Sequence, residues 1–214
     1  MHAVVPLIGP EVNALALPDT DARIIANPNC STIQMVVALK PLHDRYRLRR
    51  VTVATYQAVS GAGRRGVKQL EEEVTGGTAS DPVFPHSIAN NALPQIASFS
   101  DDGFTAEEHK MIDETRKILG LSALPVAPTC VRVPVVDSHS EAISCEFAED
   151  FDLVELRQLI AAFTGIVLRD APVDGIYPLA KDAAGRDEVF VGRLRRDPSV
   201  ARGVPMRVEA VNPR

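Results

Sequence analysis

The sequence predicts an α+β fold in which a mixed or antiparallel sheet carries helices on one face. Three observations predict it. Several short stretches alternate apolar and polar residues, others repeat apolar residues at helical spacing, and some strand-like stretches follow one another with no helix between them. With 214 residues, 45% of them hydrophobic, the chain is long enough to bury a core.

The first 28 residues predict little structure of their own. Residues 3–13 and 23–27 are short apolar stretches that predict two strands. Two strands do not make a stable domain. We therefore expect residues 1–28 to belong to a larger unit, and a second unit to span residues 29–214.

The next part predicts helices on either side of a strand. The expected elements are a helix over 31–45, a strand over 49–59, a glycine-rich turn over 60–66, a helix around 67–74 and a long loop over 75–100. Pro41 lies within the first helix and should kink or shorten it, because proline cannot donate a backbone hydrogen bond.

The second half begins with a well-marked helix. Thr105 and Glu108 form a capping box ahead of it, and Gly120 should end it. The further expected elements are strands over 130–136 and 142–147, a helix over 153–165, and strands within 165–170 and 188–197. The tail over 196–214 shows no helical period, and we assign it no element.

Composition excludes several classes of protein. The net charge of −5 argues against a nucleic-acid binder. No apolar run approaches the ~20 residues that span a bilayer, and the N-terminus lacks the basic region of a secretory signal. None of the three cysteines is in a C-x-x-C pair, so we expect neither a disulfide scaffold nor a metal site. These features indicate a cytoplasmic protein with reduced thiols.

Cys30 is the first candidate for chemistry, because it stands where a strand-like stretch meets the start of a helix. Backbone N–H groups at a helix N-terminus stabilise a thiolate and lower its pKa. The alternative is that Cys30 is a small buried hydrophobe, as cysteines often are. That alternative is favoured for Cys130 and Cys145, which lie inside apolar strands.

Other candidates are charged residues and a glycine-rich turn. His139 is expected in a serine-rich loop and would suit acid–base chemistry, although a solvated loop histidine fits equally well. Arg132 lies in an apolar strand, so it either meets a buried acid or grips a carboxylate in a cleft. Glu107 and Lys110 share a helix face and could be only a surface ion pair. The turn at Ser60 and Gly61 is a weak signal for a nearby phosphate or flat ring.

Five motifs taken together are far more specific. They are IIANPNCSTIQMVVALKPL (24–42), TYQAVSGAG (55–63), FTAEEHKMIDETRKILG (104–120), TCVRVPVVDSHSEA (129–142) and EVFVGRLRRD (188–197). In order and spacing they resemble bacterial aspartate-β-semialdehyde dehydrogenase from about residue 4 to about residue 195. The resemblance implies the catalytic and dimerisation fold of that family, similar to the C-terminal domain of glyceraldehyde-phosphate dehydrogenase.

The resemblance also implies roles in catalysis. Cys30 would be the nucleophile that forms a thioester, and Gln57 would orient the substrate or the intermediate. His139 would be the general acid and base. Ser60 and Gly61 would approach the cofactor NADP.

Substrate binding would fall to four further positions. Arg132 would hold the α-carboxylate of the substrate and Glu107 its amino group. Lys110, together with Asn29, would bind inorganic phosphate. The Glu107–Lys110 pair matches the E-x-x-K of the family, which weakens the surface ion-pair alternative.

The implied reaction is the NADP-dependent reductive dephosphorylation of L-aspartyl-4-phosphate to L-aspartate-4-semialdehyde, and its reverse, in lysine, threonine and methionine biosynthesis. A homodimer in the cytoplasm is implied, with no nucleic-acid or membrane partner. Two alternatives stay open: a dimerisation fragment or degenerate paralogue without activity, and an enzyme like N-acetyl-γ-glutamyl-phosphate reductase. The E-x-x-K and HSEA motifs favour the aspartyl enzyme.

The chain also departs from the family. The glycine-rich phosphate loop of a Rossmann domain and the C-terminal helix are missing from the sequence. We therefore expect residues 1–28 to be a remnant of the nucleotide-binding domain, and this chain alone to bind NADP weakly or not at all. On this interpretation the chain is a fragment, a truncated gene product or a degenerate paralogue.

Overall fold

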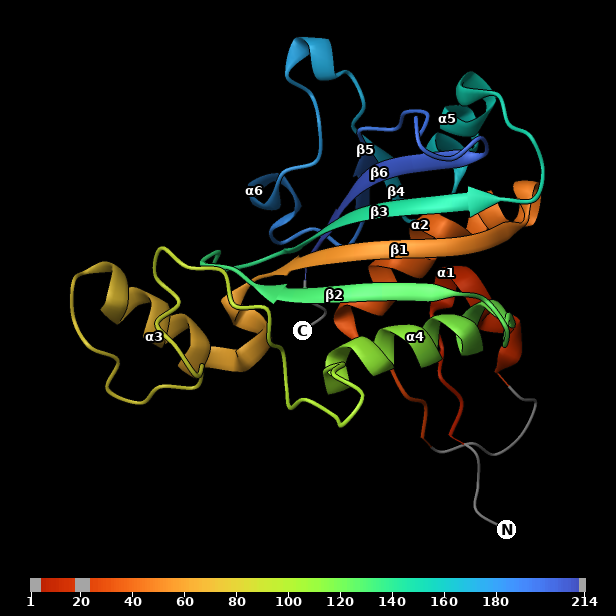
Figure 1. Ribbon diagram of the computed structural model, residues 1–214. Coiled ribbons are helices and arrows are strands. Elements are labelled where there is room, and N and C mark those ends of the chain that lie inside the picture. Colours follow the sequence, from red (N-terminus) through yellow and green to blue (C-terminus); the bar gives the residue numbers. More distant parts are fainter. Residues whose placement is uncertain (1–4, 18–23, 212–214) are drawn as a thin grey trace.

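A six-stranded mixed sheet forms the centre of the computed structural model, which describes residues 5–17 and 24–211 (Figure 1). The strand order is β2-β1-β3-β6-β5-β4. The strands are β1 (Leu48–Gln57), β2 (Val126–Arg132), β3 (His139–Phe147), β4 (Ile166–Leu168), β5 (Val189–Gly192) and β6 (Gly203–Ala210). The pairs β1–β2 and β4–β5 are parallel and the other three are antiparallel. The α+β fold with a mixed sheet is confirmed.

Four of the described helices contact this sheet, one of them a single short turn against β6. The α-helices are α1 (Pro10–Asn13), α2 (Cys30–Tyr46), α3 (Gly63–Val74), α4 (Ala106–Leu119), α5 (Leu153–Ala162) and α6 (Ala180–Ala183). Short 3₁₀ turns are η1 (Ala14–Ala16), η2 (Val59–Ala62) and η3 (Pro172–Asp174). Helix α2 crosses β1, β3, β5 and β6, while α4 packs on β2 and α5 on β4. Figure 1 shows α2 behind the sheet and α3 extending beyond the end of β1.

Burial alternates along β1 and shows which face is covered. Val51 and Val53 point to the helices and are almost fully buried, whereas Thr52 and Tyr56 on the other face are exposed. Successive side chains of a strand point to opposite faces, so this pattern indicates a sheet with one face in the core. The other face of β1, β2 and β3 is largely uncovered.

Helix α2 starts at Cys30 because Asn29 caps it. The Asn29 side-chain oxygen accepts hydrogen bonds from the backbone N–H groups of Ser31 (3.0 Å) and Thr32 (3.1 Å). The helix continues through Pro41 to Tyr46, so the expectation that Pro41 shortens it is wrong. Pro41 is buried against the fold, and the packing of this long helix offsets the one backbone bond that proline removes.

Several element boundaries differ from those expected. The capping box of Thr105 and Glu108 is present, and Gly120 ends α4 in the left-handed conformation as predicted. The strand expected over 130–136 begins at Val126 and stops at Arg132, since Pro134 has no N–H with which to extend the ladder. The helix expected over 153–165 ends at Ala162, and α3 begins at Gly63 rather than near residue 67.

The N-terminal part is also less regular than predicted. Residues 1–4 and 18–23 lie outside the described part of the chain. Of the two expected strands, the described residues show a single parallel bridge, from Leu7 to Ala26. Residues 10–13 form the short helix α1 instead, because Pro10 suits the first helical position.

The tail contains a central strand that we did not predict. Strand β6 pairs with β3 over residues 139–146 and with β5, so it joins the two halves of the sheet. The signal was present in the sequence, because the apolar residues at 204, 206, 208 and 210 alternate with Pro205, Arg207 and Glu209. The prolines of the tail and its lack of a helical period made the stretch look like a loop.

The position of β6 makes its apolar face important for stability. Val208 is fully buried, so we expect Val208→Ala to lower the free energy of unfolding by about 2 kcal/mol. Val136→Ala is the control, because Val136 is 52% exposed, and we expect a change within about 0.5 kcal/mol. Urea denaturation measures both. Equal effects of the two substitutions would contradict the central placement of β6.

Candidate active site

Cys30 is the first residue of α2 and is held there by contacts to α4. Its neighbour Asn29 donates a backbone hydrogen bond to Glu114 Oε2 (2.7 Å) and a side-chain bond from Nδ2 to Glu107 Oε1 (2.9 Å). The cysteine itself is half-buried. The start of α2 is therefore fixed by two carboxylates of a neighbouring helix.

Gln57, the last residue of β1, joins the same cluster. Its Nε2 donates to Ser31 Oγ and to Glu107 Oε1 (3.0 Å). Gln57 and Ser31 are buried, and Glu107 is only 7% exposed. The end of β1, the start of α2 and the first turn of α4 thus meet through polar side chains.

Arg132 and His139 approach from the neighbouring strands. Arg132 ends β2 in register with Gln57, and His139 begins β3. Arg132 Nη1 donates to the carbonyl oxygen of Ala58 (2.6 Å), and the N–H of Ala58 donates to His139 Nδ1 (3.1 Å). The backbone of Ala58, the residue after β1, therefore holds the side chains of Arg132 and His139 in place.

Gly61 leaves room beside these two residues. A Cβ built at Gly61 would lie 2.8 Å from Arg132 Nη1 and 3.2 Å from His139 Nε2. The 2.8 Å distance is shorter than real side chains show, so a larger residue at this position would force the Arg132 guanidinium to move. The structure brings Cys30, Gln57, Glu107, Arg132 and His139 into one site.

Burial sets the protonation of Cys30. It raises the pKa of the thiol to about 11, and the negative charge of Glu107 raises it further. The N–H of Ser31 and the guanidinium of Arg132 act in the opposite direction. The expectation of a lowered pKa is wrong for this structure, because burial outweighs the helix N-terminus.

His139 is neutral for a related reason. Burial and the nearby Arg132 guanidinium lower its pKa to about 4. Since Nδ1 accepts the Ala58 N–H, the proton of the neutral ring is on Nε2. In the described part of the chain Nε2 has no hydrogen-bond partner. His139 was expected in a loop, and the structure instead places it on a strand with a free donor beside Gly61.

Lys110 and Ser60 lie at the edge of this site. Lys110 is exposed, one turn after Glu107 on α4 and close enough to lower the pKa of Glu114. Ser60 lies in η2 and donates from its hydroxyl to Asp137 Oδ1 (3.3 Å). Neither contacts Cys30 through a hydrogen bond among the described residues.

The structure adds residues that sequence reasoning missed. Glu114 follows Glu107 by two helical turns and therefore lies on the same side of α4, a spacing that could have identified it. Ser31 needed the fold, because its contact with Gln57 joins residues 26 positions apart. Glu141, two residues after His139 on the same side of β3, is fully buried.

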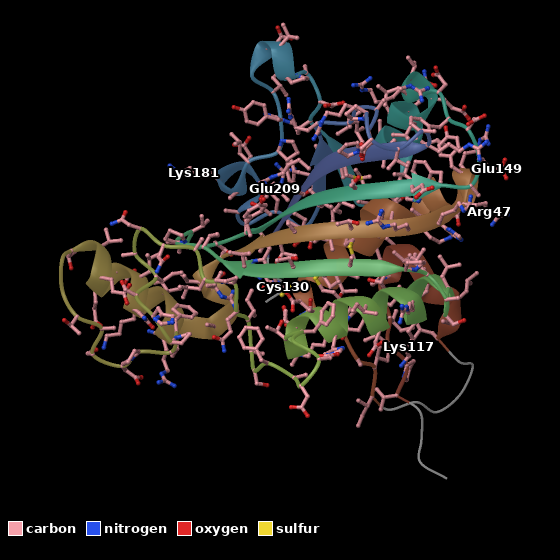
Figure 2. The ribbon with its side chains drawn as sticks, in the orientation of Figure 1. Arg47, Lys117, Cys130, Glu149, Lys181 and Glu209 are labelled. Atoms are coloured by element: carbon pink, nitrogen blue, oxygen red, sulfur yellow. The ribbon has the colours of Figure 1, made fainter. Side chains whose placement is uncertain are left out.

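The other two cysteines are inside the core, as expected. Cys130 lies between β2 and α4 (Figure 2), where its sulfur contacts Met111 Sδ at 3.5 Å. Within residues 5–17 and 24–211 none of the three cysteines forms a disulfide, and no group of three or more His, Cys, Asp or Glu side chains is placed to hold a metal ion. None of the described helices is both long and apolar enough to cross a membrane.

Comparison with known proteins defines the class to which this fold and site belong. Residues 39–210 match the family described as semialdehyde dehydrogenase, dimerisation domain, and the chain belongs to that family. Its relatives are more particular: the chain is 47% identical to the aspartate-semialdehyde dehydrogenase of Aquifex aeolicus and 44% identical to that of Bacillus subtilis. These matches include 99% and 97% of this chain. The predicted resemblance to bacterial aspartate-semialdehyde dehydrogenases is confirmed.

Solved structures agree with these matches. The chain is similar to aspartate semialdehyde dehydrogenase II from Vibrio cholerae complexed with ASA, with a TM-score of 0.91, 42% identity, and 97% of this chain and 63% of that chain covered. The aspartate semialdehyde dehydrogenase structure from Candida albicans with NADP gives a TM-score of 0.72 at 26% identity. The match covers 96% of this chain and 61% of that chain. The chain spans 64% and 63% of the length of the Aquifex and Bacillus relatives.

The neutral, buried His139 makes stability depend on pH. The folded chain resists protonating the ring until about pH 4, whereas the unfolded chain accepts a proton near pH 6.5. The contribution of the neutral ring to the free energy of unfolding is fully present above pH 6.5. It is lost as the pH falls toward 4, by about 3 kcal/mol in total. We expect His139→Asn to remove that part of the acid destabilisation in urea titrations at pH 7, 5.5 and 4.

His86→Asn serves as the control, because His86 is an exposed histidine on a loop. If the wild-type chain and His139→Asn lose stability in parallel between pH 6.5 and 4, the buried neutral state of His139 is contradicted.

Proposed function

We propose that this chain carries the acyl-transfer site of an aspartate-semialdehyde dehydrogenase, which converts L-aspartyl-4-phosphate to L-aspartate-4-semialdehyde in the pathway to lysine, threonine and methionine. The observation that carries the proposal is the convergence of Cys30, Arg132 and His139 at adjoining ends of α2, β2 and β3. The ASA bound to the Vibrio relative supports the substrate class.

Cys30 is the proposed nucleophile. Its sulfur attacks the acyl carbon of aspartyl phosphate, the carbon–oxygen bond to phosphate breaks, and phosphate leaves with the bonding electrons to give a thioester. Because burial favours the thiol, the thiolate depends on the two groups that oppose burial, the Ser31 N–H and the Arg132 guanidinium. Gln57, bonded to Ser31 and Glu107, orients the acyl group beside the sulfur.

His139 is the proposed hydrogen-bond donor to the reacting oxygen. Its Nε2–H lies beside Gly61 without a partner among the described residues, so it can donate a hydrogen bond to the oxygen of the acyl carbon as negative charge develops there. After reduction of the thioester, the same hydrogen bond stabilises the negative oxygen of the thiohemiacetal. Its collapse gives the aldehyde and reforms the Cys30 thiolate, and the neutral ring keeps its Nε2 proton throughout.

Four residues are proposed to bind the substrate. The guanidinium of Arg132 pairs with the α-carboxylate and the carboxylate of Glu107 with the amino group. Lys110 and Asn29 bind the departing phosphate. Glu107 and Asn29 are already joined by a 2.9 Å hydrogen bond, so the amino and phosphate subsites adjoin each other.

NADP is the proposed cofactor, and it supplies the hydride that reduces the thioester. The chain fits this at Gly61, where a side chain would fill the space next to His139 and Arg132. Ser60 and Gly61 are the residues that would lie against the nicotinamide ring. The NADP in the Candida structure supports the cofactor class.

We also propose a homodimer in the cytoplasm, with small molecules as its other partners. The uncovered face of β1, β2 and β3 supports pairing, and the matched family is described as a dimerisation domain. Residues 1–28 are proposed to belong to the nucleotide-binding part and residues 29–214 to the catalytic and dimerisation domain.

A reaction that needs no cofactor tests the role of Cys30. Incubation of the chain with L-aspartyl-4-phosphate is expected to release phosphate stoichiometrically with Cys30 and to add an aspartyl group to its peptide in mass spectra. We expect Cys30→Ser to slow this acylation at least about 1,000-fold, because a serine hydroxyl is a much poorer nucleophile than a thiolate. Cys145→Ala is the control, since Cys145 is buried on β3. Acylation of Cys30→Ser at the wild-type rate would refute the proposal.

Arg132→Lys tests the carboxylate subsite. Lysine keeps the charge but cannot make two parallel hydrogen bonds, so we expect the substrate concentration for half-maximal acylation to rise about 10- to 100-fold. The maximal rate should change much less. Arg50→Lys, on the exposed face of β1, is the control. A fall in maximal rate with unchanged half-saturation would instead make Arg132 a group that acts only in the transition state.

A further inference from the structure

Glu141 is a buried acid that the proposed reaction does not use. It lies on β3 two residues after His139, so both side chains point toward the helices. Its exposed fraction is 0%, and in register it lies between Thr55 of β1 and Val208 of β6. A carboxyl group in the middle of a sheet, facing the core, requires a specific explanation.

The polar groups around Glu141 have unused hydrogen-bonding capacity. In the part of the chain that the structure describes, both carboxyl oxygens of Glu141, both amide atoms of Gln34 and the hydroxyl of Thr55 lack partners. Gln34, on α2, is the side chain whose amide faces the Glu141 carboxyl group, and donation from this amide opposes burial by lowering the pKa of Glu141. A carboxylate offers only acceptors, whereas a neutral carboxyl adds a donor that the Gln34 amide oxygen can accept.

Among the described residues, the cation that acts on Glu141 is Arg207, whose charge lowers the pKa of the acid. The charged and titratable groups near it are Glu209 and Arg207 of β6, His139 of its own strand, Cys30 of α2 and Cys130 of β2. Arg207 is bound to Glu209 Oε1 through Nε (2.9 Å) and Nη2 (2.6 Å). Burial raises the pKa of Glu141 to about 8, and the Glu209 charge acts in the same direction.

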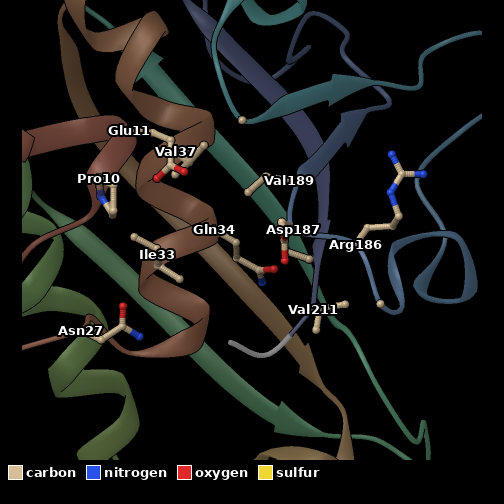
Figure 3. Close-up of a pocket in the computed structure, with 13 residues that line it drawn as sticks. Pro10, Glu11, Asn27, Ile33, Gln34, Val37, Arg186, Asp187, Val189 and Val211 are labelled. Atoms are coloured by element: carbon tan, nitrogen blue, oxygen red, sulfur yellow. The ribbon is translucent and has the colours of Figure 1, made fainter. Parts of the chain in front are cut away.

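Gln34 also lines a cavity of about 520 Å³ between α1, α2 and residues 185–187, and it projects from α2 toward the sheet (Figure 3). Both atoms of its amide are themselves buried.

Glu141 also reaches the reacting sulfur electrostatically. A negative charge on Glu141 raises the pKa of the Cys30 thiol, as Glu107 does. Gln34 and Cys30 lie on the same helix, with Gln34 one turn further along α2. A bond from Glu141 to Gln34 would tie the strand that begins with His139 to the helix that begins with Cys30.

We propose that Glu141 is a positioning residue that works as a neutral carboxylic acid: it bonds to Gln34, holds β3 against the first turns of α2, and keeps negative charge away from Cys30. The inference rests on the proposed role of Cys30 as nucleophile and names a residue that controls it.

Alkylation of Cys30 by iodoacetamide measures how the charge of Glu141 affects the thiol, and it needs no substrate. The rate at Cys30 is followed by peptide mass spectrometry from pH 6.5 to 9.5 in the wild type and in Glu141→Gln, which keeps the shape but cannot ionise. The ratio of the variant rate to the wild-type rate should be near one at pH 6.5 and rise to about threefold or more at pH 9.5. Glu146→Gln, on the same strand, is the control, with a ratio near one throughout.

Two outcomes overturn the proposal. A ratio well above one at every pH means that Glu141 is charged throughout, and a ratio of one at every pH means that its charge does not reach Cys30. Infrared spectra of the wild-type chain with carbon-13 glutamate provide a measurement that needs no variant. They should show a protonated carboxyl at pH 6.5 that disappears by pH 9.5. Its absence at pH 6.5 would also overturn the proposal.

The two proposals fail separately. If aspartyl phosphate does not acylate Cys30, the proposed function is wrong, while the alkylation ratio still reports on Glu141. If acylation occurs but the ratio does not depend on pH, the function stands and the inference about Glu141 falls.

Discussion

The packing of α2 across the sheet is the constraint on which the site depends. This helix buries Met35, Leu39 and Leu42 completely against the strands, so its axis cannot shift without opening the core. Its first turn is then fixed by the Asn29 cap and by the two carboxylates of α4 that hold Asn29. Cys30 belongs to this first turn. The position of its sulfur beside Arg132 and His139 therefore depends on hydrophobic packing further along the helix.

Burial also decides the charges at the site. Cys30 and Glu141 are acids whose pKa values rise, and His139 is a base whose pKa falls, all with loss of water as the main cause. The helix N-terminus and the Arg132 charge both favour the Cys30 thiolate, but they change its pKa less than the loss of water does. Cys30 and His139 are therefore neutral in this site, beside the charged guanidinium of Arg132. The orienting contacts, from Ala58 to His139 and from Gln57 to Ser31, are already in place.

Short sequence patterns predicted much of the fold, and contacts between distant segments explain the rest. The capping box at Thr105 and the strand over β1 follow from patterns a few residues long, and the structure has both. Strand β6 was not predicted although its residues alternate, because the tail contains prolines and has no helical period. Cys30, Arg132 and His139 were named from sequence, and they lie together. Their protonation was not predictable, since it depends on how much water each group loses. The contact of Glu114 with Asn29 joins residues 85 positions apart, so it too needed the fold.

The place of β6 in the sheet has a consequence for how the polypeptide is made. Strands β1, β2 and β3 emerge from the ribosome first and can pair with one another, while β4 and β5 form a separate parallel pair. The two sets touch through β6, which is translated after all of them. The nascent chain must therefore carry two unjoined half-sheets, each with a bare edge open to wrong pairing, until this last strand is inserted between them.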